Sequence, residues 1–166
     1  MEFELKLLSR SAIPDALEKA QRYRLLNEPW QAESICLDIL RVEPANQTAL
    51  ITLLLAITDQ FGPEIPASRA REVLRSIQGD YEKAYYTGII CERCARARLK
   101  QGVLGANDIA YRELNDAMHW YQEAETRRPA GNDDAILRWN TCARTLMRHP
   151  ELRPKPEERP EPVLDE

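Results

Sequence analysis

The 166-residue chain is long enough for one domain with its own core or for a short helical solenoid. Its formal net charge of -4 is uneven, because residues 149–166 hold three basic and six acidic side chains while residues 1–148 hold 20 and 21. A body of net charge -1 offers no broad cationic field for phosphate backbones, which argues against nucleic-acid binding.

The first eleven residues are expected to form a lead-in without a targeting signal. Met1-Glu2-Phe3-Glu4 carries acid where a signal peptide has positive charge, and the longest apolar run, residues 49–57, is too short to span a bilayer. With no export signal, the four cysteines are expected to be free thiols of a reducing compartment. We therefore expect a soluble, cytoplasmic protein that does not associate with membranes.

Helical periodicity covers most of residues 12–148, and no segment shows the alternation of a half-buried strand. The sequence therefore predicts an all-α domain over residues 12–148. Residues 149–166 are rich in Pro and acid and are expected to form a flexible tail. The expected helices cover residues 12–26, 29–42, 46–60, 67–78, 81–101, 107–127 and 133–147.

One spacing recurs in the second helix of each expected pair. A small residue is followed by a larger one four positions later, and by a small or apolar one three positions further on. In two of the three copies a Pro then stops the helix, and an Asn follows that can cap the next one. The copies are Ala32-x3-Cys36-x2-Ile39-x4-Pro44, Ala70-x3-Leu74-x2-Ile77 and Ala117-x3-Tyr121-x2-Ala124-x4-Pro129.

This spacing resembles the second helix of the tetratricopeptide repeat (TPR) family, whose first helix places an aromatic residue three positions after a small one. Ala20 and Tyr23 fit that first helix, and Gly88 and Cys91 fit it with Cys in the aromatic position. The resemblance implies a right-handed α-solenoid of antiparallel helix pairs, with three hairpins and a C-terminal capping helix. Neither helix of such a pair can bury its face alone, so neighbouring hairpins must stack.

The third expected hairpin, residues 81–127, is longer than a regular repeat. Ala32 stands nine positions after Tyr23 in the first hairpin, whereas Ala117 stands 26 positions after Cys91 in the third. The helical pattern continues through most of the surplus, which lengthens both helices. We expect this hairpin to project beyond the solenoid edge and to turn at Gly102-Val103-Leu104-Gly105.

Cys91 and Cys94 have the spacing that zinc sites and thiol redox enzymes share. Zinc needs two further converging ligands, but the remaining Cys and His residues stand singly along the chain. A redox pair opens a helix after a strand, whereas this pair lies within a helix. We therefore predict that both thiols pack in the core, and that the protein is not an enzyme and holds neither metal nor cofactor.

The three tryptophans, Trp30, Trp120 and Trp139, all fall within helical patterns. Packing in the core is the expected role of each, with Trp30 half exposed at a helix start.

In the TPR family, first helices line a concave groove that binds an extended peptide or a partner's helix. The resemblance carries that role to thirteen positions here. Their lining is apolar in the middle with arginines toward one side, so the expected partner is a protein segment that combines aliphatic side chains with carboxylates. The positions are Leu17, Gln21, Arg24, Ile51, Leu55, Thr58, Tyr85, Ile89, Glu92, Arg96, Leu137, Thr141 and Arg144.

The sequence favours a protein-binding adaptor and leaves two alternatives open. One is a dedicated secretion or assembly chaperone of the three-repeat TPR type, with a client in the groove and a homodimeric state. The other is a metal or thiol-redox protein built on Cys91 and Cys94. Glu161-Pro-Val-Leu-Asp-Glu166 has the mixture that the groove prefers, so the chain's own tail is a further candidate occupant.

Overall fold

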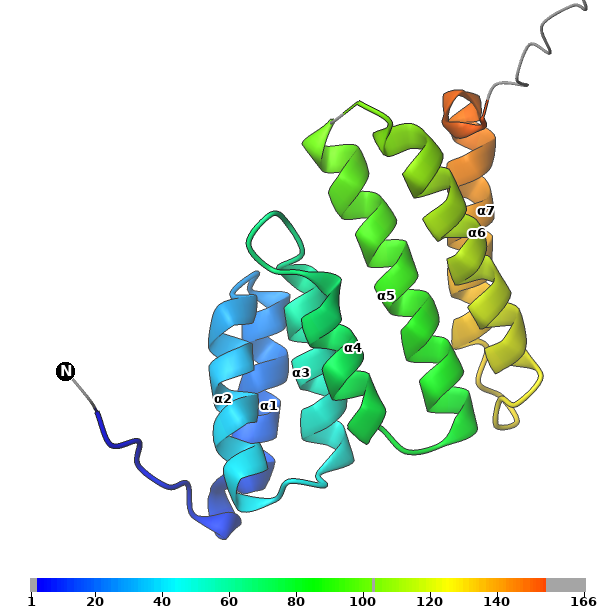
Figure 1. Ribbon diagram of the computed structural model, residues 1–166. Helices are drawn as coiled ribbons and strands as arrows, with labels where there is room; N and C mark the ends of the chain where they lie inside the picture. The colour runs from blue at the N-terminus through cyan, green and yellow to red at the C-terminus, as the bar shows by residue number, and fades with distance from the viewer. Residues whose placement is uncertain (1–2, 103, 155–166) are drawn as a thin grey trace, which may run out of the picture.

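The computed structural model describes residues 3–102 and 104–154, and over these the chain is all-helical, without a strand (Figure 1). None of the helices described is long and apolar enough to cross a bilayer. Short 3-10 turns, η1 (Arg10–Ala12) and η2 (Pro150–Leu152), flank the helices. The helices are α1 (Ile13–Leu25), α2 (Pro29–Val42), α3 (Gln47–Asp59), α4 (Ala67–Ser76), α5 (Asp80–Gln101), α6 (Ala106–Glu125) and α7 (Asp134–Arg148).

Local chemistry explains where several of these helices begin and end. Pro14 and Pro29 stand in the first turns of α1 and α2, where the missing N–H costs nothing. The Asn46 side chain accepts a hydrogen bond of 2.9 Å from the Ala49 N–H and so caps α3. Gly102 ends α5 and Gly105 precedes α6, both in the left-handed conformation that glycine adopts without strain.

Each helix packs against the next one along the chain, and the helices form two layers. In Figure 1, α2, α4 and α6 lie in front of α1, α3 and α7, with α5 in the middle. The third hairpin is the longest, since α5 and α6 have 22 and 20 residues against 10 to 14 in the first four helices. The surplus therefore lengthens both helices, while Val103 of the predicted turn lies outside the described residues.

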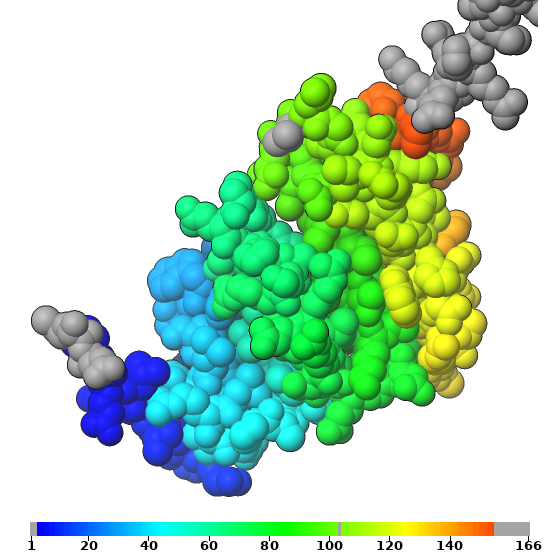
Figure 2. Space-filling view, viewed as in Figure 1, coloured from blue at the N-terminus to red at the C-terminus, as the bar shows by residue number. Residues whose placement is uncertain are grey.

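The core is divided along α5. One cluster gathers buried residues of α1–α4 with Ile90 and Cys94 of α5, and another gathers residues of α5, α6, α7 and η2. Half-buried Leu55 and Tyr86 pack against both clusters. We call the junction where α3 and α4 meet α5 the seam. In Figure 2, side chains fill the space that separates the α4 and α5 ribbons in Figure 1.

The small residues of the repeated spacing are buried where helices meet. Ala32, Ala70 and Ala117 are fully buried. Gly88 of α5 lies against the Tyr121 ring of α6 so closely that a Cβ atom there would stand 2.6 Å from Tyr121 Cε1. Small side chains thus allow the helices to approach, which is the physical reason for the spacing.

The expected tail begins later than the composition predicts. Leu152 of η2 is only 3% exposed and packs in the cluster of α5, α6 and α7, so residues 149–154 belong to the folded part. Residues 155–166 lie outside the described residues. Pro and charge dominate this stretch, and a single apolar residue in a 3-10 turn leaves no periodic signal.

Trp120 differs from the prediction of core packing, because 37% of its surface is exposed. Trp30 is 60% exposed, in line with the expected half exposure, and Trp139 is half-buried within the α5–α7 cluster. For Trp120 the reason is the packing of α6, which buries Ala117, Tyr121 and Ala124 and turns its neighbouring positions outward.

Candidate functional site

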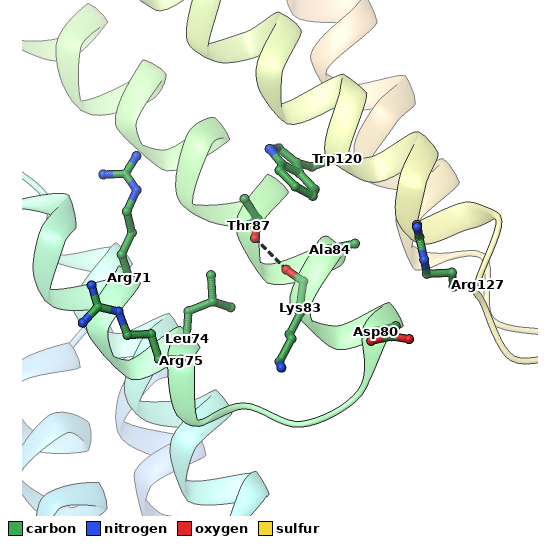
Figure 3. Close-up of a pocket in the computed structure, with 9 residues that line it drawn as sticks. All are labelled: Arg71, Leu74, Arg75, Asp80, Lys83, Ala84, Thr87, Trp120 and Arg127. Carbon is green, nitrogen blue, oxygen red and sulfur yellow. Dashed lines mark hydrogen bonds between the residues drawn. The ribbon is translucent and has the colours of Figure 1, made fainter.

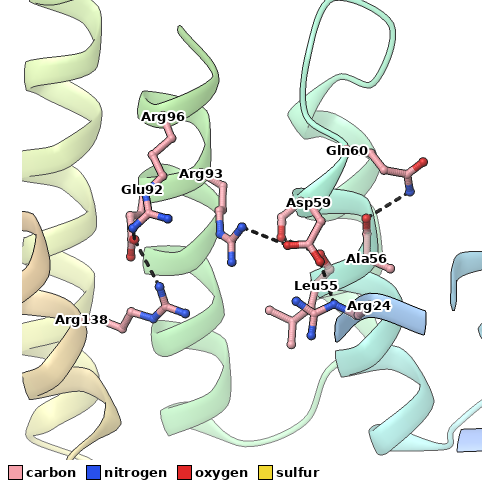
Figure 4. Close-up of polar contacts among 10 residues, drawn as sticks. Arg24, Leu55, Ala56, Asp59, Gln60, Glu92, Arg93, Arg96 and Arg138 are labelled. Carbon is pink, nitrogen blue, oxygen red and sulfur yellow. Dashed lines mark hydrogen bonds and ion pairs between the residues drawn. The ribbon is translucent and has the colours of Figure 1, made fainter. Parts of the chain in front are cut away.

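Charged residues from alternate helices meet on one side of the protein (Figure 4). We call this group the arginine face. Its members are Arg24 of α1, Asp59 of α3, Glu92, Arg93 and Arg96 of α5, and Arg138 of α7.

Asp59 of α3 forms ion pairs with α1 and, across the seam, with α5. Its carboxylate accepts a hydrogen bond of 2.8 Å from Arg24 Nε and one of 2.9 Å from Arg93 Nη1. All three side chains are about one-fifth exposed, so water screens these ion pairs only in part. Burial lowers the pKa of Arg93, while Asp59 raises it, and the guanidinium remains charged at neutral pH.

Glu92 is a buried carboxylate with three partners. Its side chain is 2% exposed; Oε1 lies 2.7 Å from Arg96 Nη2 and 3.3 Å from Arg138 Nη1. The Tyr121 hydroxyl donates a 2.7 Å hydrogen bond to Oε2. Burial and the Glu92 charge raise the pKa of Tyr121, which therefore stays protonated as a donor. A buried charge needs such compensation, so Glu92 fixes the arginines around it.

The arginine face carries an excess of positive charge. Four arginines surround two carboxylates, which leaves a formal charge of +2. Arg96 is about half exposed and Arg138 about one-third exposed, so both guanidinium groups keep donors open to solvent. A carboxylate that approaches this face meets guanidinium donors that are already oriented. Each of their counter-charges, Asp59 and Glu92, is shared by two arginines, so positive charge remains.

Aromatic and aliphatic side chains adjoin these charges. Half-buried Tyr85 stacks on Tyr81 with ring centroids 5.7 Å apart, and burial raises the pKa of Tyr85, so its hydroxyl is protonated. Half-buried Leu55 appears beside Arg24 and Asp59 in Figure 4. The face therefore offers apolar contact as well as hydrogen-bond donors.

The structure brings three of the thirteen predicted groove residues, Arg24, Glu92 and Arg96, into the arginine face. A fourth, Leu55, lies beside it in Figure 4. Leu17, Ile51, Tyr85 and Thr141 are half-buried, and Gln21, Leu137 and Arg144 are exposed on the same helices.

Two predicted groove residues, Thr58 and Ile89, are buried in the core instead of facing a groove. Thr58 is 3% exposed and its hydroxyl donates to the Leu55 carbonyl, while Ile89 is 1% exposed in the α5–α7 cluster. Neither side chain can contact a partner without rearrangement. Glu92 is equally buried, so it acts through Arg96 and Arg138 rather than by touching a partner.

Sequence reasoning missed Asp59, Arg93 and Arg138. Arg93 and Arg138 each stand one position beyond a predicted groove residue, so a register of one residue decides whether they are included. Their ion pairs join residues 34 and 46 positions apart, and no local sequence pattern predicts a pair at that separation.

The cysteines lie in surroundings that keep them protonated. Cys94 is buried and Cys91 is half-buried, and burial raises the pKa of the Cys91 thiol to about 11 and also raises that of Cys94. A nucleophilic or metal-binding cysteine needs the thiolate, which is scarce here at neutral pH. Within residues 3–102 and 104–154, no three His, Cys, Asp or Glu side chains converge as metal ligands.

Comparison with protein-family models, curated proteins and solved structures found no match to this chain. The function of the arginine face therefore has to be argued from its geometry.

Proposed function

We propose that this chain is a protein–protein interaction adaptor that binds an extended, carboxylate-bearing segment of a partner across the arginine face. The observation that carries the proposal is the excess charge of +2, presented by arginines that the buried Glu92 and the partly exposed Asp59 hold in place. Pre-oriented guanidinium groups recognise carboxylates in pairs of parallel hydrogen bonds and lose little side-chain freedom on binding.

The proposed architecture behind this face is a right-handed α-solenoid of the TPR type. Supporting it are the antiparallel order of neighbouring helices in Figure 1, the buried small residues Ala32, Ala70 and Ala117, and the close contact at Gly88. In such a solenoid α1, α3, α5 and α7 line one surface, which is where the arginines gather. The proposal places α7 as the capping helix of the third hairpin.

The partner segment combines acidic and aliphatic side chains. Its carboxylates bond to Arg96 and Arg138, and its aliphatic side chains cover Leu55 and the 62% exposed Leu137. Because the arginines lie partly in solvent, the charges contribute more to association rate and selectivity than to affinity. The proposed role is non-enzymatic and cytoplasmic, and it involves neither a cofactor nor nucleic acid.

The test begins with capture of partners from the source cell by the immobilised full chain. Arg96→Ala and Arg144→Ala should each reduce recovery of the true partner about fivefold or more, because Arg96 is an exposed guanidinium of the arginine face and the proposed groove extends to the exposed Arg144 of α7. The matched control is Arg41→Ala with Lys19→Ala, exposed cations of α2 and α1 outside the arginine face. Recovery should fall as salt rises. Equal recovery by all variants would overturn the proposal.

A further inference from the structure

A second charged feature lies in the other layer of the protein. A pocket of about 700 Å³ opens between α4 and α6, with α5 as its floor (Figure 3). We call it the cationic pocket. It shares no lining residue with the arginine face, so a role for it is independent of the function proposed above.

The cationic pocket holds positive charge that the described part of the chain leaves uncompensated. Arg71, Arg75, Lys83 and Arg127 line it with a single carboxylate, Asp80, for a formal charge of +3. Among residues 3–102 and 104–154, no carboxylate oxygen lies within 4.0 Å of the charged nitrogens of the first three. Arg127 alone has a near partner, Glu123, at 2.8 Å. The arginine face differs, because each of its arginines is paired with a carboxylate that two arginines share.

The rest of the lining is apolar and aromatic. Trp120 of α6 stands at one wall with 37% of its surface exposed, and Leu74 and Ala84 contribute apolar surface. Exposed indole rings bind proline rings well, and aromatic grooves are a recurring way to bind proline-rich extended segments. Cations around an indole therefore fit a segment that contains both prolines and carboxylates.

We propose that residues 155–166 of the same chain occupy the cationic pocket. Their sequence, KPEERPEPVLDE, holds five acidic and two basic side chains, a net charge of -3 against the +3 of the pocket. It also supplies prolines at 160 and 162 for the Trp120 ring, and Val163-Leu164 for the apolar surface. These residues lie outside the described part of the structure.

Residues 155–166 are long enough to reach the cationic pocket from Pro154. Pro154, the last described residue, lines a second pocket together with Asn107 and Asp108 at the start of α6, whereas Trp120 of the cationic pocket lies toward the end of that helix. From Asp108 to Trp120 the helix rises about 18 Å, whereas twelve extended residues span up to about 40 Å. Residues 162–164, eight to ten residues beyond Pro154, can extend about 26–36 Å and can thus lie against Trp120.

Both the arginine face and the cationic pocket could attract residues 155–166, and their free positive charge distinguishes them. The sequence alone suggested the groove of the first helices for this segment. In the structure, the arginines there share Asp59 and Glu92, whereas Arg71, Arg75 and Lys83 have no ion pair among the described residues. Tethering adds an effective concentration that can reach about a millimolar, so even weak intrinsic binding fills the pocket.

The test follows the side-chain N–H resonances of the three tryptophans in the full-length chain. Glu157→Gln/Glu158→Gln/Glu161→Gln removes three carboxylates without shortening the protein. We expect the Trp120 resonance to move toward its position in a chain that ends at Pro154, while Trp30 and Trp139 stay unchanged. The shortened chain retains every described core residue, since all lie at or before Leu152.

A synthetic peptide of residues 155–166 should restore the Trp120 signal of the shortened chain. Arg75→Glu/Lys83→Glu should weaken that binding about fivefold to tenfold, and the matched Lys19→Glu/Arg41→Glu variant should bind normally. Higher salt should also weaken it.

Three results would overturn the proposal. The first is a Trp120 resonance that neither the neutralised nor the shortened chain changes. The second is a peptide that shifts the amide signals of Leu55, Arg96 and Arg144 and leaves Trp120 alone, which would place the segment on the other layer. The third is an effect of the neutralised variant that depends on protein concentration, because docking within one chain does not.

Discussion

At the scale of single residues, the contact between Gly88 and Tyr121 sets how closely α5 and α6 approach. An added Cβ atom would lie 2.6 and 2.7 Å from two ring carbons of Tyr121, and the ring cannot retreat because its hydroxyl is bonded to Glu92. One glycine thus links the packing of the long hairpin to the buried carboxylate that orients the arginine face.

Replacing Gly88 with Ala is therefore expected to destabilise the fold. Alanine favours a helix by up to about 1 kcal/mol, but overpacking of a filled core costs about 1–3 kcal/mol, and the second effect should win here. Urea unfolding measures the difference. The control is Gly62→Ala, whose added Cβ would meet only the Gln60 carbonyl at 3.9 Å. A Gly88→Ala variant as stable as the parent would show that α6 can shift outward freely.

The buried thiols predict how stability depends on pH. Burial raises the pKa of both Cys36 and Cys142 from 9.0 to about 12, so the folded chain keeps two protons that the unfolded chain releases. Their contribution is complete below pH 9.0 and is lost as pH rises toward about 12. In that window each thiol lowers the free energy of unfolding by about 1.4 kcal/mol per pH unit.

Urea unfolding at several pH values from neutral to alkaline tests this dependence. The double variant Cys36→Ala/Cys142→Ala should be less stable at neutral pH, since it loses buried volume, but its stability should fall less steeply above pH 9.0. Parallel curves for the parent and the variant would contradict the burial of these two groups as charge-free thiols.

At the scale of elements, helix ends were predictable because their signals are local. Pro29, Asn46 and Gly102 act on the turn in which they stand, and the structure begins or ends helices beside each of them. Contacts between elements were not predictable in the same way. Leu152 gave no periodic signal, and the ion pair of Glu92 with Arg138 depends on the relative position of α5 and α7, which pairwise packing along the chain determines.

The 3-10 turn η2 offers the sharpest test at this scale. Leu152 is 3% exposed within the α5–α7 cluster, so Leu152→Ala should lower the free energy of unfolding by about 2–3 kcal/mol. The same substitution at Leu104, which is fully exposed near the α5–α6 turn, should have almost no effect. Thermal unfolding of both variants checks this. Equal effects would return residues 149–154 to the flexible tail that the composition suggested.

At the scale of the whole molecule, the seam joins two separate core clusters. Leu55 and Tyr86 contribute apolar contact to both, and Asp59 holds Arg24 of α1 and Arg93 of α5 at 2.8 and 2.9 Å. Ile90 and Cys94 of α5 are also buried in the α1–α4 cluster, so the Asp59–Arg93 ion pair adds to an apolar junction between α1–α4 and α5–α7. Repeat-like proteins unfold cooperatively only while such junctions between neighbours are strong.

Asp59→Ala should therefore weaken both stability and cooperativity. It leaves two arginines, each about one-fifth exposed, without their shared counter-charge, and breaking a partly buried ion pair in this way costs up to about 3–5 kcal/mol. Asp116→Ala, at an exposed position of α6, is the matched control and should behave like the parent. Amide hydrogen exchange then separates the two halves. In the parent, the slowest amides of α3 and α6 should exchange together, whereas in Asp59→Ala those of the less stable half should exchange first. If both halves of the variant still exchanged at one common rate, the apolar contacts across the seam would be sufficient to couple them, and the ion pairs of Asp59 would serve the arginine face alone.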